Sequence, residues 1–170
     1  MKKDRVMVDI ETLGLDRSSS ILSIAAVRFD QDGVGDTFYE IIDQRTCQDA
    51  GLSLDLETLD WHLSQGTFGG RELVDGRDLQ TALEYFAEWY GHADEVWANS
   101  PSFDCEVLEY AGEQVAVEMP WHFSEERDVR TIKNLSCAAE LEFDGTKHQA
   151  LDDAMHQARI VSRTLSELEG

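Results

Sequence analysis

The chain has 170 residues, and 14 Lys and Arg against 35 Asp and Glu give it a formal net charge of −21. A hydrophobic fraction of 42% excludes a disordered acidic tail, and the length suits one domain with its own core. No apolar stretch approaches the roughly 20 residues that span a bilayer, so we expect no membrane association. Cys47, Cys105 and Cys137 are widely spaced without a C-x-x-C pair, which is typical of reduced thiols in the cytoplasm.

The N-terminal part of the chain predicts three β-strands. Residues 6–10 are short and β-rich, residues 21–29 form the longest apolar run, and residues 37–42 complete the set. Turn-forming residues at 30–33 separate the last two strands. Short connections between consecutive strands predict an antiparallel meander.

The rest of the chain adds a short strand at 95–99 and several helices. Leucines at helical spacing predict a helix over 54–63 whose apolar face is made of Leu56, Leu59 and Leu63. Caps and periodicity predict further helices after Asp78, after Ser100 with Pro101 in first position, near 128–132, and from about 148 to 168. This order indicates a mixed α/β sheet flanked by helices, and with no linker visible we expect residues 1–170 to form a single domain.

The net charge bears on the kind of partner. Because non-specific affinity for nucleic acid comes mainly from Lys and Arg, a charge of −21 argues against binding to phosphate backbones. Carboxylates that hold divalent cations are the exception, since they turn a negative patch into one that attracts phosphate. The function therefore depends on whether the chain contains such a carboxylate cluster.

Two carboxylates stand at the end of the first predicted strand. Asp9 and Glu11 are separated by one residue, so both side chains point to the same face of the strand. Carboxylates at the end of a hydrophobic strand are costly unless they are solvated, paired or bound to metal. In so acidic a chain this spacing also arises by chance, and a solvated strand end is the alternative interpretation.

A third carboxylate, Asp104, lies in the first turn of the helix that follows the strand at 95–99. The helix dipole favours an acidic residue there, which gives Asp104 a purely structural alternative. A strand–helix junction at the carboxyl edge of a sheet is, however, where α/β proteins usually build their sites. This position makes Asp104 a candidate site residue.

The last segment of interest spans 148–154 and contains His148 and Asp153. An ideal helix turns by about 500° over five residues, which leaves these two side chains roughly 140° apart. They can converge only if His148 stands on the loop before the helix while Asp153 projects from its first turns. A lone histidine at a helix start is otherwise more often a surface residue.

Together the three segments resemble the DEDD exonucleases of the histidine subtype, 3′–5′ exonucleases with a ribonuclease H-like fold. The resemblance covers about residues 6–161 and rests on the run from Asp9 to Gly14, on Asp104, and on the run from His148 to Ala154. It extends in particular to the single-domain, often phage-encoded exonucleases of the Rv2179c-like group. It implies an antiparallel meander that is continued by parallel strands and flanked by helices.

The resemblance also implies a mechanism. It assigns two Mg²⁺ or Mn²⁺ ions, which stabilise charge on the attacking and leaving oxygens of a phosphodiester and prefer hard oxygen ligands. His148 is then the general base that deprotonates the attacking water, with Glu11 in the catalytic set. The four metal ligands that it implies are Asp9, Glu11, Asp104 and Asp153.

The substrate implied by the resemblance is a single-stranded 3′ end of DNA or RNA, cut to nucleoside 5′-monophosphates. Thr12, Leu13 and Gly14 are expected near the terminal nucleotide, with Leu13 or Phe103 packed against its base. Trp61 is a further candidate contact, although relatives carry an aromatic residue where this chain has the neighbouring His62. The resemblance leaves a homodimer open and implies a cytoplasmic protein, in the host cytoplasm if the chain is phage-encoded.

Two alternatives remain. The same fold without catalysis would be a metal-binding or protein-interaction module. An acidic mimic of nucleic acid would bind a basic protein partner and show no metal-dependent hydrolysis. Neither alternative explains why the carboxylates fall in three contexts that resemble one family.

Overall fold

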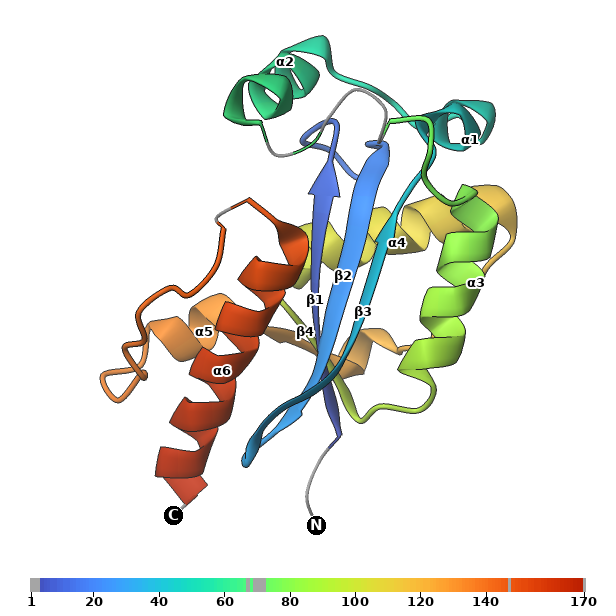
Figure 1. The fold of residues 1–170 in the computed structure, drawn as a ribbon. Helices are drawn as coiled ribbons and strands as arrows, with labels where there is room; N and C mark the ends of the chain where they lie inside the picture. Colours follow the sequence, from blue (N-terminus) through green and yellow to red (C-terminus); the bar gives the residue numbers. More distant parts are fainter. Residues whose placement is uncertain (1–3, 67, 69–72, 147, 170) are drawn as a thin grey trace.

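The computed structural model describes residues 4–66, 68, 73–146 and 148–169. Its centre is a five-stranded sheet with the strand order β3-β2-β1-β4-β5 (Figure 1). The predicted antiparallel meander forms one half of this sheet and consists of β1 (Arg5–Thr12), β2 (Ile21–Asp30) and β3 (Gly33–Ile41). The three N-terminal strands are therefore confirmed, with somewhat different ends.

The other half of the sheet is parallel. β4 (Glu95–Ala98) lies beside β1, and β5 (Glu126–Asp128) lies beside β4. The sequence predicts β4 but not β5, because the Glu-Arg-Asp run of β5 carries no apolar signal. The expected mixed sheet, a meander continued by parallel strands, is confirmed.

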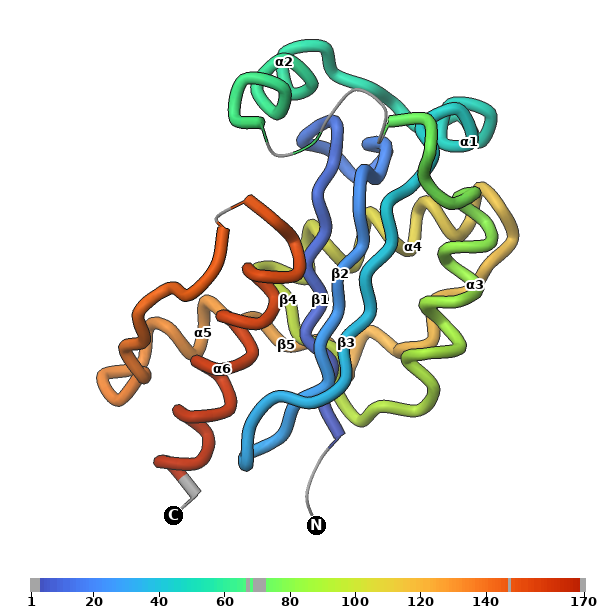
Figure 2. Tube along the Cα trace, in the orientation of Figure 1, coloured from blue at the N-terminus to red at the C-terminus, as the bar shows by residue number. Residues whose placement is uncertain are grey.

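Helices cover both faces of the sheet, and Figure 2 shows the two layers they form. α3 (Leu79–Tyr90) and α4 (Pro101–Val115) pack on one face. α5 (Val129–Lys133) and α6 (Ala150–Glu169) pack on the other. In the described part of the chain, none of the helices combines the length and apolar character needed to cross a membrane.

Side chains of β1 alternate between these two layers. Val6, Val8 and Ile10 enter the core under α3 and α4, whereas Met7 enters the core under α5 and α6. Because the alternation continues along the strand, Asp9 and Glu11 face the α6 side of the sheet. The pattern of β1 thus aims two carboxylates at the helix that carries Asp153.

Several helices begin where their caps predict. Asp78 accepts a hydrogen bond from the backbone N–H of Thr81, and Asp128 accepts one from Arg130. α4 begins at Pro101 as expected, but the Ser100 hydroxyl makes no cap bond to its backbone. Capping residues therefore located helix starts even where the side-chain bond itself is absent.

Other helical features differ from the sequence-based expectation. α1 (Gln44–Asp49) and a 3₁₀ turn at Phe123–Glu125 were not predicted, because both are too short to show periodicity. The predicted helix forms as α2 (Leu56–Gln65), but its leucines do not make the face that packs inward. Leu56 and Leu63 are exposed, and the buried side chain of α2 is His62.

Candidate active site

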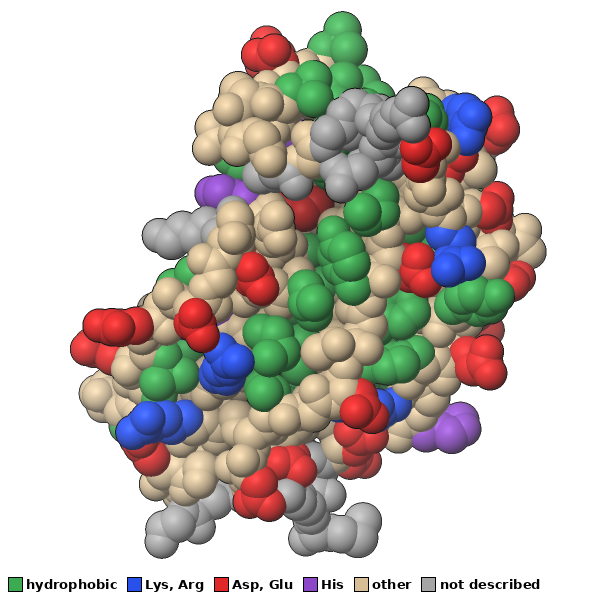
Figure 3. Space-filling model, viewed as in Figure 1, with side chains coloured by type: hydrophobic (Ala, Val, Ile, Leu, Met, Phe, Trp, Pro, Cys, Tyr) green, Lys and Arg blue, Asp and Glu red, His purple; other side chains and the backbone are tan. Residues whose placement is uncertain are grey.

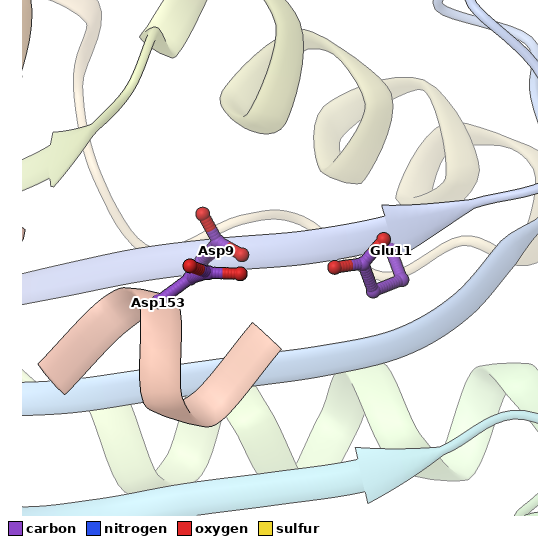
Figure 4. Close-up of side chains that lie close together, drawn as sticks. All are labelled: Asp9, Glu11 and Asp153. Carbon is purple, nitrogen blue, oxygen red and sulfur yellow. The ribbon is translucent and has the colours of Figure 1, made fainter. Parts of the chain in front are cut away.

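Three of the predicted site carboxylates converge at the carboxyl end of β1. Asp9 and Glu11 project from the strand, and Asp153 projects toward it from the first turn of α6 (Figure 4). One oxygen or more from each side chain lies within 4.8 Å of the others. Residues 144 positions apart in the chain thus form one cluster, which is called the acidic cluster below.

The small residues of α6 explain how Asp153 comes so near the strand. Ala150, Ala154 and Ala158 recur at four-residue spacing and are all buried against the sheet. Short side chains on this face let the helix axis approach the strands closely. Asp153, next to Ala154, is thereby held at the edge of the interface over β1.

Asp104 lies beside the acidic cluster rather than in it. Its carboxylate is buried in the first turn of α4 and accepts a hydrogen bond from the backbone N–H of Ile10 at 3.2 Å. Its charge nevertheless raises the pKa of both Asp9 and Glu11. The structure therefore brings all four predicted carboxylates into electrostatic contact, with three of them at ligand spacing.

Burial and mutual repulsion keep protons on these carboxyl groups. Burial, with the charges of Asp153 and Asp104, raises the pKa of Glu11 to about 8. Burial raises the pKa of Asp104 to about 7, against the opposing effects of the Ile10 N–H and of Arg130. The pKa of Asp9 is also raised well above its ordinary value, by burial first and then by Asp104. A bound cation would relieve this cost.

The donor set fits a divalent cation. All the ligand atoms are carboxylate oxygens, which Mg²⁺ and Mn²⁺ prefer over the softer donors of cysteine and histidine. Within the described residues, no Lys or Arg side chain lies within ion-pair distance of Asp9, Glu11 or Asp153. The countercharge that this cluster needs is thus of the kind that metal ions supply.

Gln157 is a site residue that sequence reasoning missed. Its side-chain amide donates a hydrogen bond to Asp9 Oδ1 at 2.9 Å, and the side chain is buried. The bond fixes which way the Asp9 carboxylate turns. A signal was present in the sequence, because Gln157 follows Asp153 by four residues and so shares its face of the helix.

His148 occupies the position that the helical geometry requires. It stands before α6 with a backbone φ of 62°, and its N–H donates a hydrogen bond to Asp153 Oδ2 at 3.0 Å. The imidazole lies edge to face with the Trp61 ring, at 5.1 Å between ring centroids and 86° between planes. His148 and Glu11 also line one small cavity of about 30 Å³, which is large enough for a water molecule.

A larger cavity opens on the other side of Glu11. Its volume is about 460 Å³, and its walls come from the end of β1, from α2 and from Phe103 of α4. Of the predicted substrate contacts, this cavity is lined by Thr12, Gly14, Trp61 and Phe103. In the space-filling view, acidic side chains lie recessed in the hollow beneath α2 (Figure 3).

Leu13 does not reach this cavity. Its side chain is fully buried, at 0% exposure, and its backbone N–H donates to the carbonyl of Ser20. The expectation that Leu13 packs against a base is therefore corrected. Leu15, which is 84% exposed and lines the cavity, provides the apolar side chain at this rim.

Close packing explains the glycine of this loop. A Cβ on Gly14 would lie 2.5 Å from the hydroxyl oxygen of Ser19, closer than two such atoms can approach. Thr12 ties the same turn together, because its hydroxyl donates to the Gly14 carbonyl at 2.7 Å. Thr12 and Gly14 thus shape the wall of the cavity through the backbone.

Solved nuclease structures share this fold. The match to cell-death related nuclease 4 (CRN-4) has a TM-score of 0.73 and 16% identity over 97% of this chain and 64% of that chain. The nuclease domain of 3′hExo, a DEDDh family member bound to rAMP, matches with a TM-score of 0.74 and 13% identity over 98% and 93%. E. coli exonuclease I in complex with an oligonucleotide matches with a TM-score of 0.63 and 12% identity over 98% and 40%. At these identities the likeness concerns the fold.

Fold and acidic cluster together define a class, the nucleases with the ribonuclease H-like exonuclease fold. A search of curated proteins found no match to this chain. The profile of one family, described as the 3′-5′ exoribonuclease Rv2179c-like domain, matches residues 4–165. The chain belongs to this Rv2179c-like family of 3′-5′ exonucleases.

Proposed function

We propose that residues 1–170 form one exonuclease domain that removes nucleoside 5′-monophosphates from the 3′ ends of single-stranded nucleic acid. RNA is the first substrate to test, because the family description names an exoribonuclease. The observation that carries the proposal is the convergence of Asp9, Glu11 and Asp153 beside a cavity of about 460 Å³. Pockets of this size hold small molecules such as a single nucleoside.

Two Mg²⁺ or Mn²⁺ ions are proposed to be held by Asp9, Glu11 and Asp153, with Asp104 completing the set. When bound, such ions stabilise the negative charge that develops on the attacking and leaving oxygens of the phosphodiester. The raised pKa values of the free carboxyl groups support this assignment, since no Lys or Arg among the described residues forms an ion pair with Asp9, Glu11 or Asp153.

The chain's own residues position the substrate and move the proton. Thr12 and Gly14 form one wall of the cavity, while Trp61 and Phe103 offer aromatic surfaces on which a base can stack irrespective of sequence. His148 accepts the proton of the attacking water, because an imidazole can serve as a general base and this one lines a water-sized cavity with Glu11.

The acidic surface favours short contacts with substrate. With a net charge of −21, the protein repels long stretches of phosphate backbone, so a single-stranded end that enters a cavity is the most compatible partner. Cys47, Cys105 and Cys137 are free thiols, which fits a reducing cytoplasm. A homodimer stays a prediction that light scattering on the purified protein would check.

The experiment that tests the proposal uses 5′-labelled RNA and DNA oligonucleotides with Mg²⁺, Mn²⁺ or EDTA. We expect a ladder shortened from the 3′ end and nucleoside 5′-monophosphates as the released product. EDTA, Asp9→Asn and His148→Ala should each abolish or strongly slow the shortening. If no oligonucleotide is shortened with any metal, the exonuclease proposal is wrong and the acidic binding module becomes the hypothesis to test.

A further inference from the structure

Two rings connect the end of β1 to His148. The His62 ring is 3% exposed, and its Nε2–H donates to the carbonyl of Thr12 at 3.0 Å. The Trp61 ring lies against His62 at 4.9 Å between centroids and 75° between planes. The opposite contact of Trp61 is the imidazole of His148, at 5.1 Å and 86°.

The two ends of this series are held very differently. His62 is fixed by the Thr12 carbonyl and by the neighbouring Phe68 ring, at 5.5 Å between centroids. The His148 side chain is exposed, and its ring nitrogens form no hydrogen bond to any residue that the structure describes. Trp61 is thus the ring that contacts both the anchored histidine and the exposed one.

A general base works best when a third group orients it toward the proton that it removes. Carboxylates usually play this part, but the Asp153 carboxylate accepts the backbone N–H of His148 and does not orient its ring. The edge-to-face contact with Trp61 is the contact that restricts the ring within the described residues.

We propose that Trp61 is a positioning residue for His148, and that His62 anchors Trp61 to the end of β1. This inference rests on the proposed function, because it takes His148 as the general base. It adds to the role expected for Trp61, which both lines the cavity of about 460 Å³ and contacts the His148 ring. Trp61 therefore acts on the rate of hydrolysis and not only on the binding of substrate.

Steady-state kinetics on a single-stranded oligonucleotide test the proposal. Trp61→Ala should lower kcat about 10- to 100-fold, because misplacing a reacting group acts on the chemical step, and any accompanying rise in KM reports the lost stacking surface. Trp61→Phe keeps a ring and should recover most of kcat. Leu63→Ala, an exposed position on the same helix, is the matched control and should leave kcat within about twofold.

The same substitution in a protein that lacks His148 distinguishes an effect on the position of the His148 ring from an effect on substrate binding. In His148→Ala, the additional Trp61→Ala change should lower the residual kcat less than about twofold, since no imidazole is left to position. Two results would overturn the inference: a raised KM with unchanged kcat, or an equal loss of kcat with and without His148. His62 is less suitable for this test because its Nε2 also lies 4.0 Å from Glu11 Oε2.

The contact itself can be measured without activity. In proton–nitrogen spectra of the resting protein, the ring protons of His148 should show a ring-current shift that disappears in Trp61→Ala and persists in Leu63→Ala. Unchanged His148 signals in Trp61→Ala would overturn the inference alone and leave the exonuclease proposal standing. An inactive wild-type protein would instead overturn both, so the two failures are distinguishable.

Discussion

The two ends of β1 bury charge in opposite ways. Near its start, the Arg5 guanidinium donates from Nε to Glu95 Oε2 at 2.9 Å, and the indole N–H of Trp97 donates to the same oxygen at 3.1 Å. Near its end, Asp9 and Glu11 meet Asp153. The start of β1 thus holds a pair of opposite charges. The end of the same strand holds a group of like charges.

The two ends differ in where the neutralising charge comes from. A buried ion pair costs desolvation, but its two charged partners are both supplied by the chain, so the charges of the first end are paired on folding. In its ionised form the acidic cluster raises the free energy of the folded state, as the elevated pKa of Glu11 indicates, and either protons or a cation from solution would relieve this cost. The first end therefore serves the fold, and the second is the end proposed to bind metal.

Removing one carboxylate from the second end should have the largest effect. Asp153→Asn keeps the shape and an acceptor for the His148 N–H, yet it should lower kcat by about 10³-fold or more because a proposed metal ligand loses its charge. The matched control is Asp152→Asn, one residue earlier, whose carboxylate accepts the N–H of Thr146 and is not part of the acidic cluster. Comparable losses in both variants would contradict the assignment of the cluster.

Removing a carboxylate from the first end should act on stability instead. Glu95→Gln leaves the buried Arg5 without its charge partner, and such a loss costs about 3–5 kcal/mol. For a chain of this size, each kcal/mol lowers Tm by about 2–4 °C, so thermal unfolding should shift by about 10 °C. The kcat of the folded fraction should stay near that of the wild type. A stable but inactive Glu95→Gln protein would break the comparison.

The stability that depends on metal and pH should come from the acidic end of β1. The pKa of Glu11 is about 8 in the folded protein and near 4.5 in the unfolded chain, so the folded state binds more protons between these values. Stability without metal therefore falls as pH rises from about 5 to 8. In EDTA we expect Tm to fall by about 5 °C or more over this range, and Mg²⁺ should raise Tm more at pH 8 than at pH 5. Glu11→Gln should flatten this dependence, and an equally steep slope in that variant would contradict the explanation.

The smallest expected effect concerns Gln157. Gln157→Leu removes the hydrogen bond that orients Asp9, and loss of such a partner typically weakens metal binding about 10-fold. Titration calorimetry with Mn²⁺ would measure the change, with Gln114→Leu, an exposed position near the end of α4, as the control. Unchanged affinity would mean that Asp9 is oriented by other contacts.

The acidic cluster could be predicted from the sequence only in part. The two-residue spacing of Asp9 and Glu11 fixes a shared face, and the angle between His148 and Asp153 correctly places the histidine before the helix. Spacing does not fix distances between elements. It could not show that Asp104 stands outside the three-carboxylate group, or that Gln157 bonds to Asp9 across 148 positions.

Local patterns predicted the long elements and failed for the short ones. Strands with apolar runs and helices with caps were found, whereas β5 and α1 lack both signals. For α2 the pattern was misleading, because its leucines suggested a buried face while His62 is the residue that packs inward. His62 is buried because the Thr12 carbonyl accepts its hydrogen bond, and a contact between distant elements leaves no periodic trace.

His148 also carries a cost that belongs to its backbone. A φ of 62° is a left-handed conformation, which glycine adopts without cost and which other residues adopt rarely, although histidine, asparagine and aspartate do so more often than most. At this position glycine would fit the loop better than histidine, so stability and activity make opposite demands on one residue. Selection for thermal stability alone would favour glycine over histidine at this position. A relative that no longer needs the activity would be expected to lose this histidine early.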